Sequence, residues 1–214
     1  MTRHWMIRTA LSALAGSVLA GAALANPIQV GIGAFSTPTA TIGFENIANN
    51  ASITNQYAAQ DVIFSGGLYG DTDSGDVGMF AAVGGGNVVA GNFQNQVCTG
   101  STCLPITASF ANEIASVGFY IITQPGTTTV KVYSGHSATA TSFTFTTQDA
   151  SPATFFGVQD SAGIDKIVIA DNAAPDGFAM DRLMINSRSV PEPTTLSFLG
   201  GLLLCGVLAR RRRQ

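Results

Sequence analysis

Short apolar segments with a period of two residues recur along most of the chain. Val130 and Val132 alternate with Lys131 and Tyr133, and phenylalanines alternate with threonines at 142–146. This alternation is typical of β-strands that pack one side against a core and turn the other to water. Sustained helical periodicity is absent. The predicted strands cover residues 39–44, 61–64, 79–83, 106–110, 116–123, 128–133, 142–146, 154–158, 165–170 and 178–185.

Turn-forming residues separate several of these segments, as at 124–126, 134–135, 161–163 and 175–177. About ten short strands at this spacing favour an antiparallel sandwich of jelly-roll type. The chain has no internal repeat, which argues against a solenoid or a propeller. We therefore expect an all-β fold with a single β-sandwich domain over residues 26–189. A signal helix is expected before it and a short transmembrane helix after it.

The N-terminus has the three parts of a secretory signal. A positively charged start precedes an apolar run at 10–24, and Ala23 and Ala25 form an A-x-A cleavage pattern. The sequence predicts a signal peptide over residues 1–25 that directs the chain to the Sec translocon. An uncleaved membrane anchor is the alternative, but the apolar run is short for a membrane span.

Export fits the spacing of two cysteines. Cys98 and Cys103 frame a four-residue loop, and in an oxidising compartment we expect them to form a local disulfide. A metal site would usually need further Cys or His ligands, and His136 is the one histidine of the domain. A thioredoxin-like pair would be spaced C-x-x-C, which is two residues shorter.

The C-terminus reads as a membrane segment. Val-Pro-Glu-Pro at 190–193 interrupts regular structure, an uncharged apolar run follows at 196–209, and four arginines occupy 210–213. By the positive-inside rule the arginines stay in the cytoplasm. The 16 residues of 194–209 form roughly 24 Å of helix, which is short for a hydrocarbon core of about 30 Å. Such a marginal span suits a removable sorting signal.

These features together resemble a PEP-CTERM sorting signal over residues 190–214. The resemblance implies that an exosortase, a membrane-embedded protease, recognises Pro191, Glu192 and Pro193. It also implies a Gram-negative bacterium, an intermediate in the inner membrane, and a final place at the cell surface or outside the cell. A plain tail anchor is the alternative.

The domain itself carries further familiar segments. They are Ile-Gly-Phe-Glu at 42–45, Ile-Thr-Asn-Gln-Tyr at 53–57, Val-Ile-Phe-Ser at 62–65 and Gly-Phe-Ala-Met-Asp-Arg-Leu at 177–183. They resemble the opening and closing strands of exported PEP-CTERM modules related to carbohydrate-binding jelly rolls. The resemblance implies a structural Ca²⁺ ion held by Glu45 and Asp181, with backbone carbonyls completing its oxygen shell. The alternative is that both carboxylates face water.

Charge narrows the functional classes. Residues 26–189 carry four basic and twelve acidic side chains, a net charge of −8, which argues against nucleic-acid binding. The run from Asp71 to Asp76 begins like an EF-hand loop. Its glycine falls at the fifth position and Ala82 stands at the twelfth, so we expect a surface turn.

Catalytic signatures are missing from the sequence. His136 lies alone in a predicted turn, and no pair of carboxylates is marked by its context. Four tyrosines remain as sugar platforms, and Tyr69, between glycines, is the one expected to be exposed; the others are Tyr57, Tyr120 and Tyr133. The sequence favours a non-enzymatic surface or matrix protein. The alternatives are a carbohydrate-binding module for exopolysaccharide and, third, a secreted hydrolase.

Overall fold

The computed structural model describes residues 26–72, 89–91, 98–99, 102–103, 105–123, 126–147, 153–171 and 178–188. The predicted signal peptide with Ala23 and Ala25, the strand at 79–83 and the sorting tail with Pro191, Glu192 and Pro193 lie outside these residues. Within the described part of the chain, no helix has the length and apolar character needed to cross a membrane.

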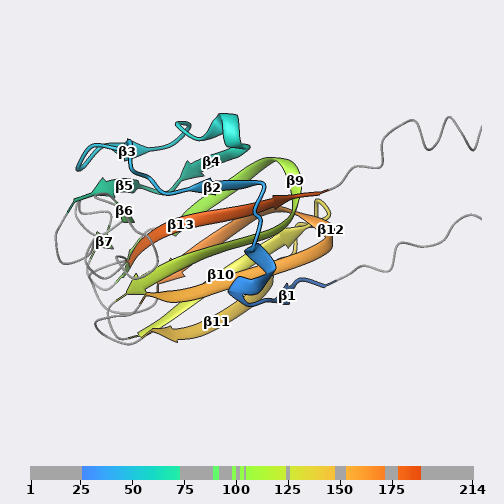
Figure 1. Cartoon of the computed structure of the whole chain (residues 1–214). Helices are drawn as coiled ribbons and strands as arrows, with labels where there is room; N and C mark the ends of the chain where they lie inside the picture. The colour runs from blue at the N-terminus through green and yellow to red at the C-terminus, as the bar shows by residue number, and fades with distance from the viewer. Residues whose placement is uncertain are drawn as a thin grey trace, which may run out of the picture.

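The described segments are strands and two short 3-10 helices (Figure 1). In chain order they are β1 Ile28–Gln29, η1 Ile32–Phe35, β2 Ala40–Ile42, β3 Ser52–Ile53, η2 Ala58–Gln60, β4 Val62–Ser65, β5 Leu68–Asp71, β6 Val89–Gly91, β7 Cys98–Thr99, β8 Thr102–Cys103, β9 Ile106–Thr123, β10 Gly126–Ser134, β11 Thr141–Thr147, β12 Thr154–Asp171 and β13 Phe178–Ser187.

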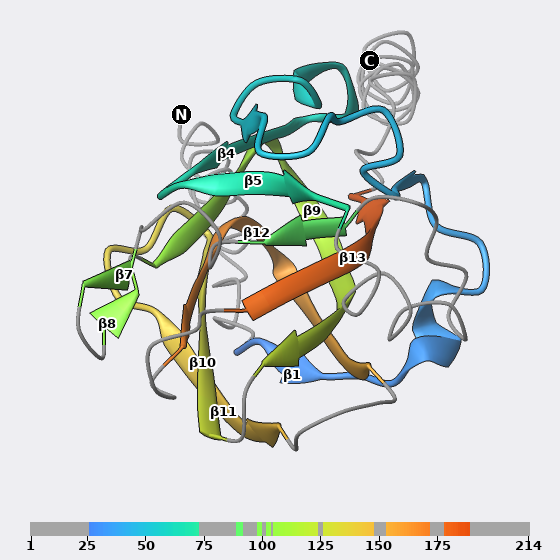
Figure 2. The same ribbon diagram turned by 90° about the vertical axis from the view of Figure 1, so that its left-hand side faces the viewer.

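All strand pairs are antiparallel, and one large sheet folds over itself into two layers. The layer that we call the front sheet has the order β11-β10-β12-β9-β4. In the back sheet β1 pairs with β12, β12 with β9 and β9 with β13. β13 also pairs with β2 and with β6, and the sheet continues from β6 through β5 to β3. Figures 1 and 2 show β10 and β11 toward one side of the molecule and β13 and β5 toward another. The expected antiparallel all-β sandwich is confirmed.

Two strands belong to both layers, which the sequence did not predict. The segments at 106–110 and 116–123 are one continuous strand, β9, and those at 154–158 and 165–170 are one strand, β12. Their pairing shifts register between Gln159 and Ile164. Bulges at this point bend both strands from one layer into the other. Because a bulge also breaks the two-residue alternation, each long strand reads as two short ones.

The core lies between the layers and is built from the alternating apolar positions. Phe119 and Phe156, direct partners on β9 and β12, pack side by side in it with ring centroids 5.5 Å apart and planes tilted by 41°. The largest fully buried side chains are Phe44, Phe64, Phe119, Phe156, Phe178, Ile42, Ile53, Leu68, Ile106, Ile114 and Ile121. Burial of this apolar surface, at about 25 cal/mol per Å², drives the layers together.

The outer face of the back sheet is partly covered by the chain itself. Gly118 and Gly157 are direct partners across β9 and β12. A Cβ at Gly118 would come within 2.8 Å of the Phe35 ring, and one at Gly157 within 2.8 Å of the carbonyl oxygen of Val30. The two glycines therefore allow the N-terminal segment and the buried Phe35 to lie against this face.

The hairpin of β7 and β8 pairs Cys98 with Cys103 as opposite Cα partners. Directly opposed residues of an antiparallel pair have Cα atoms about 4.5–5.5 Å apart, which is within the range that a disulfide spans. Only the backbone of this hairpin is described, so the disulfide stays a prediction.

Candidate functional site

The fold brings Glu45 and Asp181 to one place at the edge of β13. This strand pairs with β6 through Ala179 and Met180 and with β2 from Leu183 onward. Asp181 lies in the gap between these two ladders, and Glu45 follows β2 by three residues. The carboxylates predicted to act together thus lie near one another, although they are far apart in sequence.

A bulge holds Asp181 in this gap. Its pairing with β9 shifts register between Asp181 and Met184. Arg182 takes a left-handed conformation with φ of 54°, and its backbone N–H donates a 2.6 Å hydrogen bond to Asp181 Oδ1. Positive φ is uncommon for a residue with a side chain and marks a constrained backbone.

The surroundings of Asp181 are electrostatically unfavourable for two ionised carboxylates. Burial raises the pKa of Asp181 from 3.8 to about 7, the N–H of Arg182 opposes this rise, and the negative charge of Glu45 adds to it. Asp181 is buried, with only 1% of its surface exposed. A cation between the two carboxylates would remove both the desolvation cost and the repulsion.

Tyr57 completes this pocket. Burial first, and then the charges of Asp181 and Glu45, raise the pKa of Tyr57 to about 12. Its ring packs edge-on against Phe44 and Phe64, with centroids 5.5 and 6.3 Å away. Its hydroxyl is buried without a hydrogen-bond partner among the described residues. Two carboxylates beside an unsatisfied polar oxygen fit the all-oxygen ligand set that Ca²⁺ prefers.

A second feature is the outer face of the front sheet. The residues on it are those that alternate with buried ones along five neighbouring strands. Strand register joins them into two rows that cross the sheet. The long row is Ser142, Lys131, Val168, Thr107 and Ser65, and the short row is Tyr133, Lys166, Ser109 and Ile63. At about 4.8 Å per strand, the long row is roughly 19 Å wide.

The two lysines of the chain both lie on this face. Lys131 is exposed and lies two residues along β10 from Tyr133, which is the direct partner of Lys166. The ammonium of Lys166 lies 4.2 Å from the centroid of the Tyr133 ring, a cation–π contact. Ile63 is 45% exposed at the other end of the short row. Apart from these groups the two rows are hydroxyls and one valine, with no carboxylate.

The remaining predicted residues are placed as follows. Tyr69, expected to be exposed, is half-buried on β5, as are Tyr120 on β9 and Tyr133 on β10. Asp71 is 2% exposed and is not on a surface turn, because it is the last residue of β5 and pairs with Val89 of β6. Residues 73–76 of that motif lie outside the described chain. His136 is exposed in a turn, as expected.

The sequence did not predict the outer face of the front sheet that holds Lys131, Tyr133 and Lys166, which we call the lysine face. The alternation at 130–133 already placed Lys131 and Tyr133 on one side of a strand. The pairing of that strand with β12, which brings Lys166 beside Tyr133, depends on long-range register. Register of this kind is set by the bulges and by the core, and it leaves no local signal in the sequence.

Comparison with known proteins gives only distant matches. No family model matches the chain. No curated protein matches it either. Solved structures that match include the carbohydrate-binding module TmCBM61 in complex with β-1,4-galactotriose, at 13% identity and a TM-score of 0.42, covering 66% of this chain and 99% of that one. The K2 cleaved adhesin domain of Lys-gingipain matches at 13% identity and a TM-score of 0.47, covering 69% and 98%.

A third match is the CBM22-1 xylan-binding domain of Xyn10C from Paenibacillus barcinonensis, at 11% identity and a TM-score of 0.43, covering 71% of this chain and 95% of that one. The ligands named for these structures are ligands of those proteins. With identities of 11–13% and TM-scores of 0.42–0.47, such likenesses do not assign a ligand to this chain.

Proposed function

We propose that this protein is an exported, non-enzymatic carbohydrate-binding protein that holds an acidic polysaccharide on the outer face of its front sheet. The observation that carries the proposal is the register that gathers both lysines and the half-exposed Tyr133 on one face, in two rows that contain no carboxylate. The alternative expected from the sequence, a surface or matrix protein without a ligand, leaves this arrangement unexplained.

The chemistry of the face suits a sugar polymer. Serine and threonine hydroxyls both donate and accept hydrogen bonds, as sugar hydroxyls do. An aromatic ring offers an apolar surface with a polar tip, and Tyr133 supplies one at the β10 end of the short row. Lys131 and Lys166 add two positive charges, which favour a polymer with carboxylate or sulfate groups over a neutral one.

Binding, and not hydrolysis, follows from the same residues. Glycoside hydrolysis normally needs two carboxyl groups that flank the scissile bond. The two rows that cross the front sheet contain none. Glu45 and Asp181 are a pair, but Asp181 is buried where a polymer has no access. We assign this pair to a structural Ca²⁺ ion that ties the segment after β2 to the edge of β13.

Export and sorting remain proposals from the sequence. If the N-terminal signal and the C-terminal sorting motif are both processed, intact-mass spectrometry of the protein isolated from the native host will show an N-terminus at Asn26 and a C-terminus near Pro191. A full-length mass in the mature fraction would contradict both processing steps.

Replacement of Tyr133 by alanine tests the binding face. Tyr133→Ala is expected to lower the affinity for the host's acidic exopolysaccharide about tenfold or more, because it removes the ring and the anchor of Lys166. Affinity gel electrophoresis or calorimetry would measure this loss.

Matched controls come from the other half-buried tyrosines. Tyr69→Ala on β5 and Tyr120→Ala on the back layer remove the same side chain elsewhere, and we expect them to bind as the wild type does. Equal binding by all three variants would show that the front face is an ordinary solvated sheet surface.

A further inference from the structure

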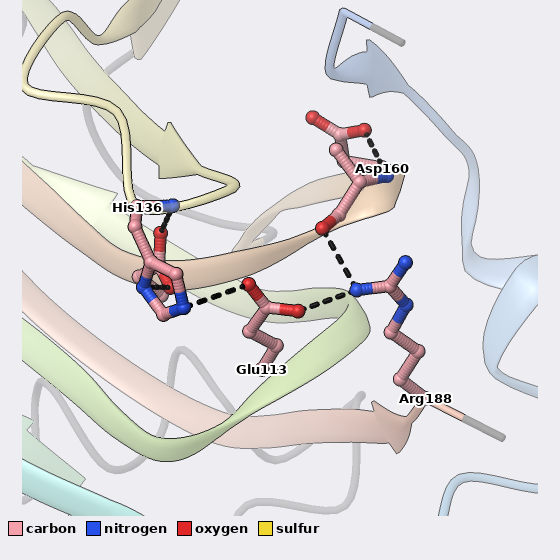
Figure 3. A network of polar contacts seen from close by, with 6 residues as sticks. Glu113, His136, Asp160 and Arg188 are labelled. Atoms are coloured by element: carbon pink, nitrogen blue, oxygen red, sulfur yellow. Dashed lines mark hydrogen bonds and ion pairs between the residues drawn. The ribbon is translucent and has the colours of Figure 1, made fainter. Parts of the chain in front are cut away.

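Three side chains that can ligate a metal meet where β9 and β12 cross between the layers. Glu113 comes from β9, Asp165 from β12, and His136 from the turn after β10. One ligand atom from each lies within 4.8 Å of the others. Figure 3 shows the imidazole of His136 pointing toward Glu113. Neither the Ca²⁺ pocket nor the lysine face uses these residues.

The imidazole is held from one side by Asp165. Its Nδ1 lies 2.9 Å from Asp165 Oδ1, and the backbone N–H of His136 donates a 2.7 Å hydrogen bond to Asp165 Oδ2. In a neutral imidazole one nitrogen donates and the other has a lone pair. A neutral imidazole that donates Nδ1–H to Asp165 has its lone pair on Nε2.

That lone pair faces an anion. His136 Nε2 lies 3.3 Å from Glu113 Oε1, which is longer than the usual N–H···O hydrogen bond of about 2.9–3.0 Å. A lone pair and a carboxylate oxygen repel each other unless a cation lies between them. In a tetrahedral zinc site with bonds of about 2.0–2.2 Å, neighbouring ligand atoms are about 3.3–3.6 Å apart. The observed separation matches that edge.

We propose that His136 Nε2 and Glu113 Oε1 bind a Zn²⁺-class transition-metal ion, with Asp165 as the outer carboxylate that orients the imidazole. A ligating histidine commonly donates its second N–H to a carboxylate, and this contact raises its basicity. Nitrogen together with oxygen ligands selects Zn²⁺ over Ca²⁺, which prefers oxygen alone. The His136 side chain is 82% exposed, so the other coordination positions face water.

Glu113 is positioned before any ion binds. Arg188 Nη1 pairs with Glu113 Oε2 and also donates a 2.9 Å hydrogen bond to the carbonyl oxygen of Ala162, which leaves Oε1 for the ion. The backbone N–H of Ala162 in turn donates to Asp160 Oδ1 at 2.8 Å (Figure 3). Gly163 has φ of +90°, and a Cβ there would lie 2.7 Å from Glu113 Oε2. The glycine thus leaves room for the carboxylate.

The ion would fasten the turn after β10 to the crossing point of the two long strands. To test the site, the purified full chain without a polyhistidine tag is titrated with Zn²⁺ by calorimetry and with Co²⁺ by visible absorption. We expect saturable binding of one ion and the intense visible bands of tetrahedral Co²⁺. His136→Asn should weaken both at least tenfold. Asparagine tolerates the left-handed backbone of this position, where φ is 57°, so this variant is expected to fold.

The other variants separate the roles. Glu113→Gln should also lose the ion, and Asp165→Asn should weaken binding about 10-fold to 100-fold, as loss of an outer-shell partner does. Asp181→Asn, in the Ca²⁺ pocket, should bind Zn²⁺ as the wild type does. An absence of saturable Zn²⁺ binding, or equal binding by wild type and His136→Asn, would overturn the proposal and leave His136 as a proton-bearing bridge between two carboxylates.

Discussion

In the presence of EDTA, the free energy of unfolding is expected to fall by roughly 4 kcal/mol between about pH 4 and pH 8 through Asp181 alone. Asp181→Asn removes this fall. The group responsible is a buried carboxyl whose pKa is raised from 3.8 to about 7, first by burial and further by Glu45. Urea unfolding followed by circular dichroism, at several pH values, measures the effect.

The sign follows from which state holds the proton. Below about pH 4 the carboxyl is protonated in both the folded and the unfolded chain, and no penalty arises. Between about pH 4 and pH 7 the unfolded chain loses the proton while the folded chain keeps it, so stability falls as the pH rises. Above the folded pKa of about 7 the full cost of a buried charge is present.

Calcium should offset much of this loss of stability in the wild type. The ion binds the ionised carboxylates, so at about pH 8 it stabilises the fold by about 2.7 kcal/mol at a concentration 100 times its Kd. Asp181→Asn should gain little. Asp61→Asn is the control, because Asp61 is half-exposed, its left-handed φ of 65° suits asparagine, and its oxygen can still accept from Asn112. A wild type that is insensitive to both EDTA and Ca²⁺ would refute the calcium pocket.

Removal of both front-sheet lysines is expected to lower the affinity for acidic polysaccharide about 10-fold to 100-fold. Each ammonium can pair with an anionic group of the polymer, and hydrogen bonds to charged groups contribute about 1.5–3 kcal/mol when shielded and less when exposed. The double variant Lys131→Ala, Lys166→Ala tests this in calorimetry at low salt. Because Lys131 is exposed and Lys166 half-buried on the sheet surface, the fold should survive.

Two controls isolate charge from shape. The double replacement by arginine retains both charges and should retain most of the binding, and added salt should weaken the wild type more than the alanine variant. Binding to a neutral polymer such as dextran should be weak in every case. If the alanine variant binds the acidic polymer as tightly as the wild type, the lysines have no part in recognition.

The sequence predicted what depends on local alternation. The segment at 128–133 corresponds to β10, in which buried residues alternate with more exposed ones. The segment at 178–185 corresponds to β13, which is buried on both faces and was recognised by its nearly continuous apolar run. The crossing strands β9 and β12 were divided in two because bulges near Gln159 break the alternation. Short edge pairs such as β3 with β5 were missed, since two residues leave too little pattern to recognise.

The candidate sites also differ in whether the sequence carries a local signal for them. Resemblance in two short motifs pointed to Glu45 and Asp181, and the fold places them together. The cluster of Glu113, His136 and Asp165 had no motif, because each comes from a different strand or turn and the three meet only through the crossing of β9 and β12. A histidine alone in a turn gives no indication of its carboxylate neighbours.

The most direct test of the binding face is a titration of the isotope-labelled, exported protein with oligosaccharides of the host's acidic exopolysaccharide, followed by amide chemical shifts. The largest changes are expected along β10 and the second half of β12, around Lys131, Tyr133 and Lys166. Changes confined to the outer face of the back sheet, around Phe35 and Tyr120, or no changes at all, would contradict carbohydrate binding by the front sheet.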